Sequence, residues 1–512
     1  MMAAALEEVH NLGAIFDGVA PRDAPWLTDF AEDGSATAYT YGDLADMTNA
    51  LARGLLARGL EPGTRIALIA GNSARYLIAY FGIMRAGLCP VLVNWKLPGD
   101  AIAHIHRDSG VDLALADAGH AGRVPEGVPC LRLDGPDWEA LLDPGPFAPP
   151  RMDARAAANI LYTSGSTGMP KGVPLTHRGY GYAVAAAVAG IGRPWHATLL
   201  VAAPLYHMNG LFFAKVAAMS GAHVVLMRRF EARAYLQAIE RHRIDVVTAI
   251  PTMIMLALRE TDLLARLDLS SVETVMIGSS PVTEGLAARI ARVFDDPKLV
   301  ITYGTTESGP TAFAAHPDGR PTPPPSLGVA SPHAEVRLVG GPSEDEGVLW
   351  VRSPVVMPGY LNLPEKTAER LQDGWYNTGD VMRRDAEGFY YFVDRADDMF
   401  VCGGENIHPG DVEAMLMRHP DIAEVCVVPV PDSIKGMLPA AFVVRRPGAA
   451  LDAAAVKSFA LENGPAYAHP RFVEFVEALP WQGTNKVDRR QLRERAAAWS
   501  RDLHNSQGEA TG

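Results

Sequence analysis

Residues 161 to 177, LYTSGSTGMPKGVPLTH, combine glycines, hydroxyl side chains and one lysine in a pattern that could bind a polyphosphate. Small residues let backbone N–H groups approach an anion, hydroxyls add donors and Lys171 adds a positive charge. The stretch is not a Walker loop, because Pro170 precedes the lysine and Gly172 stands where that motif needs Ser or Thr. Taken alone, it predicts either a phosphate-binding loop or a flexible surface turn, which Gly/Ser-rich stretches usually form.

Three later stretches could complete a nucleotide site. YGTTESG, residues 303 to 309, follows an apolar run and supplies an aromatic ring, hydroxyls and Glu307, a carboxylate suited to Mg²⁺. Asp380 in WYNTGD could accept both hydroxyls of a ribose, or it could form an ordinary Asx turn. Lys486 in GTNKVDRRQL lies in a short polar stretch, where a lysine alone predicts solvated surface.

The composition limits the class of protein. A chain of 512 residues predicts two or more domains, and its net charge of −13 argues against a nucleic-acid partner. The four cysteines have no metal-ligand spacing and predict a reduced, cytoplasmic protein without disulfides. The opening MMAAALEEVHNLG does not resemble a signal peptide, and polar residues interrupt the most apolar zone, 199 to 227, so we expect no membrane span.

The elements that would position these residues follow from hydrophobic patterning. Between residues 65 and 117, short apolar runs alternate with helix-period segments, and the alternation returns between 198 and 304. This predicts an α/β fold with layered, largely parallel sheets. From about residue 320 the pattern becomes that of antiparallel β-structure, and a compact α+β unit follows. We therefore predict a large N-terminal α/β domain with a β subdomain, a small C-terminal α+β domain and a disordered tail, at residues 1–396, 397–497 and 498–512.

Six segments, in their order and spacing, resemble the adenylate-forming superfamily of acyl- and aryl-CoA synthetases, nonribosomal adenylation domains and luciferases. They are YTSGSTGMPKG, PLYHMNG, YGTTE, WYNTGD, DRADDMFVCGGENIHPGDVE and NKVDRRQL. The last two are most similar to bacterial benzoate-type and 4-chlorobenzoate-type CoA ligases. The resemblance implies an enzyme that joins an acid to AMP, releasing pyrophosphate from ATP, and then transfers the acyl group to the thiol of CoA. It also implies Mg²⁺ as a cofactor.

The resemblance assigns roles to individual residues. Those implied to contact ATP or AMP are Thr163, Ser164, Gly165, Ser166, Thr167, Gly168, Lys171, Gly278, Ser279, Ser280, Tyr303, Gly304, Thr305, Asp380 and Arg395. Those implied to act in catalysis are Lys486, Thr306, Glu307 and His207, with Glu307 as the Mg²⁺ ligand. Those expected around the acid are His207, Met208, Asn209, Thr248, Ser279, Thr302 and Gly309, a mixture that favours a modest aromatic or short polar acid. Those implied for CoA are Gly403, Gly404, Glu405, Lys435 and Arg471. The resemblance also implies that the small C-terminal domain is mobile and rotates at the hinge residue Asp397 between the two steps.

Several alternatives stay open from the sequence. The acyl group could pass to the phosphopantetheine of a carrier protein, or the chain could be a non-catalytic nucleotide-binding relative. His207 favours the acyl- and aryl-CoA branch, although a hydrogen-bonded core histidine would also explain it. The chain departs from the family pattern at Val348, Asp394 and Asn485, and it lacks a lysine common near the CoA nucleotide. The expected partner is a small carboxylic acid, and a homodimer is the commonest symmetric assembly.

Overall fold

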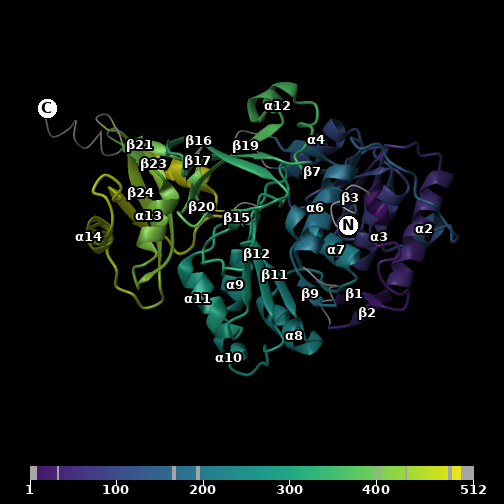
Figure 1. The fold of residues 1–512 in the computed structure, drawn as a ribbon, viewed down its shortest axis with the longest axis horizontal. Helices are drawn as coiled ribbons and strands as arrows, with labels where there is room; N and C mark the ends of the chain where they lie inside the picture. The colour runs from purple at the N-terminus through teal and green to yellow at the C-terminus, as the bar shows by residue number, and fades with distance from the viewer. Residues whose placement is uncertain are drawn as a thin grey trace. The chain divides into compact units, whose positions relative to one another are not determined.

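The computed structural model of the chain describes residues 9–30, 34–163, 169–191, 196–396, 398–402, 405–432, 435–481 and 487–497 (Figure 1). These residues form two compact units. The first unit is Met1–Val336 with Trp350–Thr378, and the second is Arg337–Leu349 with Gly379–Gly512. Parallel sheets, antiparallel strands and covering helices confirm the predicted α/β class. The division predicted at residue 397 stays a prediction, and the predicted tail lies outside the described residues.

The first sheet of the first unit has seven strands in the order β13-β12-β11-β9-β10-β1-β2, parallel except for the β1–β2 pair. Its central strands are short apolar runs buried along most of their length, as parallel strands covered on both faces require. Gly278 pairs with Thr302, which brings the carboxyl ends of β12 and β13 together. The strands are β1 (Pro25–Phe30), β2 (Ala36–Thr40), β9 (Thr198–Val201), β10 (His223–Met227), β11 (Val246–Ala249), β12 (Thr274–Gly278) and β13 (Lys298–Thr302).

The second sheet of the first unit has the order β6-β5-β3-β4-β7-β8 and is parallel except for the β7–β8 pair. The apolar runs RIALIA (65–70), CPVLVN (89–94) and DLALA (112–116), which sequence patterning predicts as strands, contain three strands of this sheet. The strands are β3 (Arg65–Ile69), β4 (Cys89–Leu92), β5 (Leu113–Ala116), β6 (Cys130–Arg132), β7 (Ala157–Thr163) and β8 (Lys171–Thr176).

Helices of the first unit share three hydrophobic cores with these sheets. Every residue of helix α3 except Arg75 is buried, and α2 begins with a capping box in which Thr40 and Asp43 bond each other's backbone. The helices are η1 (Leu12–Ala14), α2 (Tyr41–Ala57), α3 (Ala74–Arg85), α4 (Gly99–Ser109), η2 (Ala121–Arg123), α5 (Pro136–Leu141), α6 (His177–Ile191), α7 (Met208–Ser220), α8 (Ala232–His242), α9 (Pro251–Ala257), α10 (Thr261–Leu264), α11 (Glu284–Val293) and α12 (Pro364–Arg370).

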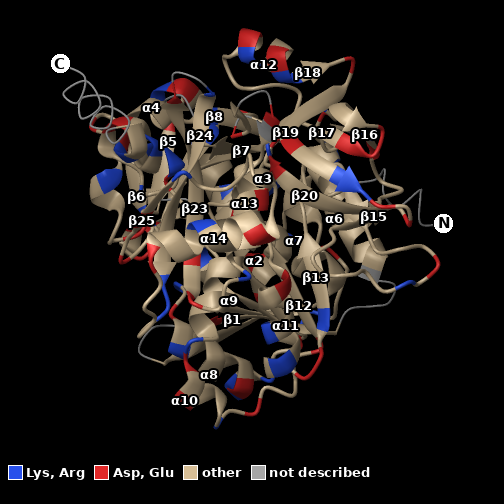
Figure 2. Ribbon diagram, turned by 90° about the vertical axis from the view of Figure 1, so that its left-hand side faces the viewer, with Lys and Arg blue, Asp and Glu red and all other residues tan. Residues whose placement is uncertain are grey.

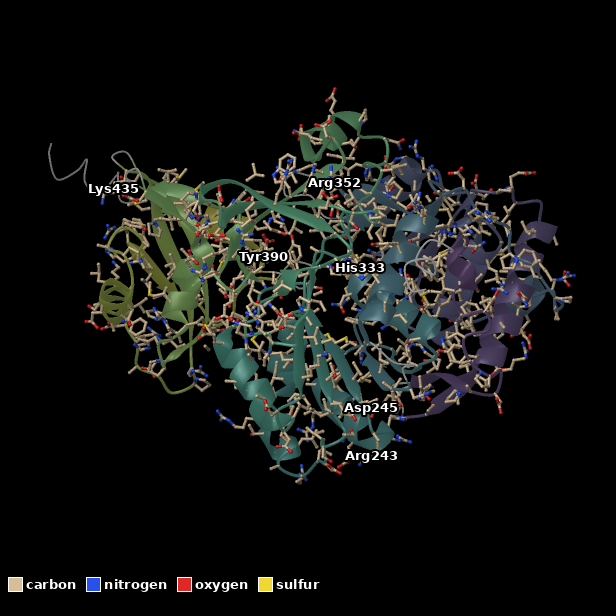
Figure 3. The ribbon with its side chains drawn as sticks, in the orientation of Figure 1. Arg243, Asp245, His333, Arg352, Tyr390 and Lys435 are labelled. Atoms are coloured by element: carbon tan, nitrogen blue, oxygen red, sulfur yellow. The ribbon has the colours of Figure 1, made fainter. Side chains whose placement is uncertain are left out.

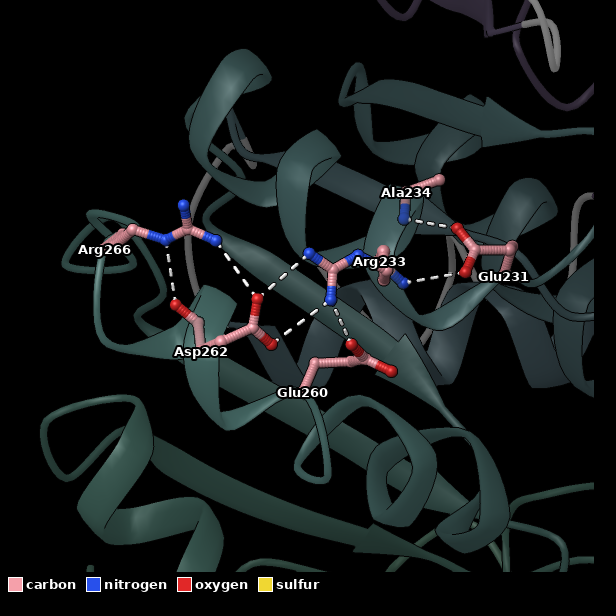
Figure 4. A network of polar contacts seen from close by, with 6 residues as sticks. All are labelled: Glu231, Arg233, Ala234, Glu260, Asp262 and Arg266. Carbon is pink, nitrogen blue, oxygen red and sulfur yellow. Dashed lines mark hydrogen bonds and ion pairs between the residues drawn. The ribbon is translucent and has the colours of Figure 1, made fainter.

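An ion-pair network on the surface joins α8 to α10 (Figure 4). Glu231 caps α8 by accepting hydrogen bonds from two backbone N–H groups of its first turn. Arg233 contacts both Glu260 and Asp262, and Asp262 also pairs with Arg266. Because most of these side chains are well exposed, the network fixes the position of α10 more than it adds stability.

In the second unit, the end of β19 pairs antiparallel with β20, so that Asp380 lies opposite Arg395. Five further strands form a sheet in the order β22-β21-β24-β23, with β25 added beside β24. Helices α13 and α14 share a core with one face of this sheet. The elements are β20 (Phe389–Arg395), β21 (Phe400–Cys402), β22 (Glu405–Ile407), α13 (Pro409–Leu416), β23 (Ile422–Asp432), β24 (Gly436–Arg445), α14 (Ala453–Asn463) and β25 (Phe472–Phe475).

Three strands contain residues of both units, namely β16 (Glu335–Ser343), β17 (Glu346–Arg352) and β19 (Trp375–Arg384). The first unit also has two short antiparallel pairs. They are β14 (Phe313–Ala314) with β15 (Gly328–Ala330), and β18 (Leu371–Gln372) with the start of β19.

Charged residues of both signs are interspersed along the ribbon, for example on α8 and α10 (Figure 2). The excess of acidic residues seen in the net charge of −13 is therefore not gathered on one element. Within the described ranges, no helix is both long enough and apolar enough to cross a membrane.

Candidate active site

The two ends of the predicted phosphate-binding loop lie side by side in the second sheet. Thr163 ends β7, Lys171 begins β8, and the two residues are partners in the antiparallel pair. The Leu361 N–H donates to the Gly172 carbonyl at 2.8 Å. A Cβ at residue 172 would lie 3.0 Å from the Leu361 Cβ, so glycine permits this close approach. The loop residues Ser164, Gly165, Ser166, Thr167 and Gly168 lie outside the described residues.

Glu307 lies in a compact turn shortly after β13. The Gly309 N–H donates to the Thr305 carbonyl at 2.9 Å, and the Thr305 and Ser308 hydroxyls are 3.0 Å apart. Gly309 has a φ of 64°, and a Cβ at Gly304 would come within 2.7 Å of the Gly309 carbonyl oxygen, so both glycines are needed. The turn leaves Glu307 only 9% exposed. A carboxylate this buried requires a hydrogen-bond donor.

Tyr360, a residue outside the sequence motifs, supplies that donor. Its hydroxyl donates to Glu307 Oε1 at 2.9 Å, and the Met357 N–H donates to the Glu307 carbonyl at 2.8 Å. The same tyrosine ring faces Lys171, whose Nζ lies 4.7 Å from the ring centroid. One tyrosine therefore brings the predicted phosphate lysine and the predicted Mg²⁺ ligand together. The stretch MPGYLN predicts a turn, but its residue types give no sign of a partner for Glu307.

Tyr360 is held by a second tyrosine and by helix α12. The hydroxyl of Tyr376 donates to the hydroxyl of Tyr360, and the Tyr360 N–H donates at 2.9 Å to Oγ1 of Thr367, in the middle of α12. Burial raises the pKa of both tyrosines, and the negative charge of Glu307 raises each further. Both hydroxyls therefore stay protonated at ordinary pH, so that Tyr376 can donate to Tyr360 and Tyr360 can donate to Glu307.

The turn after β12 is tightly constrained. A Cβ at Gly278 would lie 2.2 Å from Thr302 Oγ1, so a larger residue would displace the neighbouring strand. Ser279 has a φ of 72°, which residues other than glycine rarely adopt, and it is exposed. Ser280 follows it and is half-buried. Backbone strain of this kind clusters at ligand sites, which agrees with the predicted role of this turn.

Tyr303 and Thr306, implied for the adenine and the α-phosphate, lie on the same loop as Glu307. The ring of Tyr303 lies 5.5 Å from that of Phe313, measured between centroids. Tyr303 and Thr306 are both half-buried, so each exposes part of its side chain. The loop thus places an aromatic ring, a hydroxyl and a carboxylate within five residues.

Three of the residues expected around the acid lie where α7 begins. His207 is the N-cap residue of α7, Met208 is its first residue, and Asn209 Nδ2 donates to Ser279 Oγ at 3.2 Å. The rings of His207 and Tyr206 are 4.7 Å apart at their centroids. The hydrogen bond ties the start of α7 to the end of β12, so these predicted pocket residues are brought together.

Not all of the other residues expected around the acid have a side-chain group available to bind it. Thr248 is fully buried, and its hydroxyl donates to the Leu200 carbonyl at 2.7 Å. That hydroxyl is therefore committed to the sheet and offers no hydrogen bond to an acid in this conformation. Thr302 makes a longer contact of 3.4 Å with the Ile277 carbonyl, and Gly309 contributes backbone only.

In the second unit, the predicted ribose carboxylate and its arginine are joined directly. Arg395 Nη1 donates to Asp380 Oδ1 at 2.6 Å, and Asp380 is buried while the arginine side chain is 40% exposed. Asp394, one of the predicted departures from the resembled family pattern, accepts hydrogen bonds from the Arg395 and Gly410 N–H groups, each at 2.7 Å. Burial raises the pKa of Asp394, and these two hydrogen bonds oppose that rise. The carboxylate thus fastens the end of β20 to the start of α13.

Residues implied for CoA gather positive charge in the second unit. Lys435, labelled in Figure 3, lies in the turn between β23 and β24, and its N–H donates to Asp432 Oδ1 at 2.7 Å. Arg471 contacts the His469 ring. Burial lowers the pKa of His469, and the charges of Arg471, Lys457 and Lys435 lower it further. This field of three cations suits an anionic ligand.

Four residues with implied roles in the second unit lie outside the described residues: Asp397, Gly403, Gly404 and Lys486. Their roles rest on the resemblance alone. Glu405, also implied for CoA, is exposed and pairs with Cys402 in the short β21–β22 hairpin.

The chemistry of Glu307 fits an Mg²⁺ ion that arrives with a nucleotide. Oε1 accepts the Tyr360 hydrogen bond, and Oε2 accepts none from the described residues. No group of three or more His, Cys, Asp or Glu side chains that could hold a metal occurs within the described ranges. Mg²⁺ usually binds one or two carboxylates together with substrate phosphates, so a single buried carboxylate suits it.

Comparison with known proteins covers nearly the whole chain. The AMP-binding enzyme model matches residues 18–361, and the model of the AMP-binding enzyme C-terminal domain matches residues 411–486. A feruloyl-CoA synthase from an Amycolatopsis species is 34% identical over 490 residues, which cover 93% of this chain and 97% of that protein. A fatty acid–[acyl-carrier-protein] ligase from Streptomyces coeruleorubidus is 33% identical over 478 residues, covering 89% and 91%.

Among solved structures, an anthranilate CoA ligase in complex with anthranoyl-AMP matches with a TM-score of 0.86 and 26% sequence identity. The match covers 98% of this chain and all of that one. Sequence and structure therefore point to the same class of protein.

Proposed function

Because the chain belongs to the family of AMP-binding enzymes, we propose that it is an ATP-dependent carboxylic acid:CoA ligase that works through an acyl adenylate. The observation that carries this proposal is near full-length similarity to a CoA ligase, across both matched domains. In the first step, a carboxylate oxygen bonds to the α-phosphorus of ATP while the bond to the β-phosphate breaks and pyrophosphate leaves. In the second step, the CoA thiolate bonds to the acyl carbon, and the carbon–oxygen bond to AMP breaks.

The residues of the first unit would position the phosphates. Lys171 would place its ammonium against the β- and γ-phosphates, and Glu307 would direct a carboxylate oxygen toward Mg²⁺. When bound, Mg²⁺ supplies positive charge to the phosphate oxygens.

Residues of the second unit would act on the ribose and the α-phosphate. Asp380 would accept the ribose hydroxyls while Arg395 keeps its carboxylate in place. Lys486 would stabilise negative charge at the α-phosphate during adenylation.

For the acid, we propose an aromatic carboxylate of modest size, with hydroxycinnamates such as ferulate and 4-coumarate as the first candidates. Relatives named for these acids are 29% to 34% identical to the chain. The start of α7 and the end of β12 would form its surroundings, where Asn209 and Ser279 offer polar contacts beside the ring of His207. The resemblance of the C-terminal motifs to benzoate-type ligases stays a prediction.

For the acyl acceptor, we propose free CoA. The three cations around His469 would suit the phosphates of the CoA nucleotide. A phosphopantetheine bound to a carrier protein has no such nucleotide. The similarity to a carrier-protein ligase keeps that acceptor as the second candidate. A cytoplasmic location and a homodimer remain predictions.

The test is a panel of benzoates, hydroxycinnamates and short aliphatic acids, assayed for AMP and thioester formation with CoA. A second arm replaces CoA by a phosphopantetheinylated carrier protein. We expect acid-dependent AMP release and a CoA thioester with at least one aromatic acid. AMP release with the carrier protein but not with CoA would select the second candidate, and an absence of pyrophosphate exchange with every acid would contradict both.

A further inference from the structure

A short strap, residues 357 to 361, ties together the two loops that would hold the phosphates and the metal. At its start, the Met357 N–H donates to the Glu307 carbonyl, and at its end the Leu361 N–H donates to the Gly172 carbonyl, each at 2.8 Å. Tyr360 lies between these two anchors and contacts the functional side chain on each side. The backbone of both loops and two of their side chains thus meet on one strap.

We propose that Tyr360 is a positioning residue that fixes the Glu307 carboxylate and the Lys171 ammonium for binding of the metal–nucleotide complex. The inference rests on the proposed function, because it assigns Glu307 to the metal and Lys171 to the phosphates. Tyr360 acts on them through two different parts of its side chain. Its hydroxyl holds Glu307 and its ring faces Lys171, so the two effects can be separated by substitution.

The hydroxyl of Tyr360 determines which carboxylate oxygen is available. It donates to Oε1 at 2.9 Å, and the Tyr376 hydroxyl that donates to Tyr360 keeps its proton directed toward Glu307. Oε2 is left for a cation. Without this donor, a carboxylate that is 9% exposed would lose its hydrogen bond and the constraint on its rotation. A hydrogen bond to a charged group contributes enough free energy to change a binding constant roughly tenfold or more.

The ring of Tyr360 acts on the lysine. Lys171 Nζ lies 4.7 Å from the ring centroid, within the range of a cation–π interaction. At a half-buried site such an interaction changes affinity by about threefold. Phenylalanine keeps the ring and loses the hydroxyl, whereas leucine loses both. Tyr360→Phe should therefore affect only the metal-dependent part of nucleotide binding.

The experiment measures ATP affinity of the full chain by isothermal titration calorimetry, with Mg²⁺ and with a chelator. In wild type, Mg²⁺ should strengthen ATP binding. Tyr360→Phe should leave the metal-free affinity within about twofold, while the gain from Mg²⁺ falls roughly tenfold. Tyr360→Leu should lose that gain and also weaken metal-free binding by about threefold.

A double-mutant cycle with Glu307→Gln separates positioning from general damage. If Tyr360 acts through Glu307, adding Tyr360→Phe to Glu307→Gln should reduce the Mg²⁺ gain no further. Tyr391→Phe is the matched control, because the Tyr391 hydroxyl also donates to a carboxylate, Asp385 Oδ2 at 3.0 Å, in the other unit. The control should bind ATP like wild type under both conditions.

The outcomes separate this inference from the function on which it rests. A wild-type chain that binds no ATP would overturn the proposed function, and this inference with it. Three outcomes would overturn the inference but leave the proposed function standing. They are a full Mg²⁺ gain in Tyr360→Phe, an equal loss of ATP affinity with and without Mg²⁺, and additive effects of Tyr360→Phe and Glu307→Gln in the double-mutant cycle. If Tyr360→Phe does not fold, Tyr376→Phe takes its place, and an unchanged Mg²⁺ gain in that variant would be equally contradictory.

Discussion

Replacing Asp380 by asparagine should reduce the preference of the enzyme for ATP over 2′-deoxyATP. Asp380 is buried, and its Oδ1 accepts from Arg395 Nη1 at 2.6 Å. Asparagine keeps an oxygen in that place but removes the negative charge that would receive the ribose hydroxyls. Because asparagine still offers a carbonyl oxygen to Arg395, and the Arg395 side chain is 40% exposed, no buried charge is left without a partner and the fold should persist.

The magnitude follows from the change of acceptor. A hydroxyl bound to a carboxylate contributes about 2 kcal/mol, and one bound to a neutral amide about 1 kcal/mol. Wild type should therefore bind 2′-deoxyATP roughly 30-fold more weakly than ATP, whereas Asp380→Asn should discriminate only about fivefold. With two ribose hydroxyls affected, ATP itself should bind the variant roughly 30-fold more weakly.

The assay is acid-dependent ATP–pyrophosphate exchange, with the KM for each nucleotide measured in wild type and variant. Equal discrimination between ATP and 2′-deoxyATP in the two proteins would refute the assignment of Asp380 to the ribose. A thermal unfolding curve of the variant checks that any loss is not caused by unfolding.

Three further predictions concern the hinge, the adenylation lysine and a buried lysine. Asp397→Pro should slow thioester formation more than adenylation, because proline fixes φ at the position that the resemblance assigns to the hinge; equal loss in both half-reactions would contradict the hinge role. Lys486→Ala should slow acyl-AMP formation by roughly 10²–10³-fold yet still convert supplied acyl-AMP and CoA to thioester; survival of adenylation would remove its assigned role. Lys215 is fully buried, its Nζ donates to the Tyr80 hydroxyl at 3.2 Å, and burial lowers its pKa well below the usual value. The unfolded chain binds a proton at Lys215 up to about pH 10.4, whereas the folded chain has lost it above the lowered pKa. The free energy of unfolding of wild type should therefore rise with pH toward about pH 10.4. In denaturant titrations at pH 7, Lys215→Met should be more stable than wild type by about 1 kcal/mol, and this advantage should disappear near pH 10. Replacing the exposed Lys366 by methionine is the control and should show no such trend. A Lys215→Met variant that is less stable than wild type at pH 7 would refute the prediction.

Local patterning predicts the elements of the first unit well. The apolar run RIALIA is β3, the segment beginning SARYLIAY contains α3, and CPVLVN contains β4. In each case hydrophobic periodicity over a few residues sets the element, and the side chain of Ser73 caps the helix. Motif order also indicated residues that the fold brings together, such as Asp380 and Arg395, which face each other across two strands.

What the sequence could not give depends on contacts between distant residues. Tyr360 and Glu307 are 53 residues apart, and no spacing rule connects them. Thr248 has the residue type of a pocket donor, but its hydroxyl is used by a neighbouring strand. Lys215 interrupts an apolar stretch, which suggests exposure, and yet it is enclosed by Tyr80 and Tyr180 in the core. In all three cases tertiary packing decides which atoms meet.

The most direct test of the two-step ligase uses an aromatic acid whose carboxylate carries a heavy oxygen isotope, with ATP, Mg²⁺ and CoA. If the carboxylate attacks the α-phosphorus and the thiol then breaks the carbon–oxygen bond, one labelled oxygen must remain on the released AMP. Mass spectrometry of the products should therefore find the label in AMP and none in pyrophosphate. Label in inorganic phosphate together with ADP, or unlabelled AMP, would contradict the acyl-adenylate mechanism.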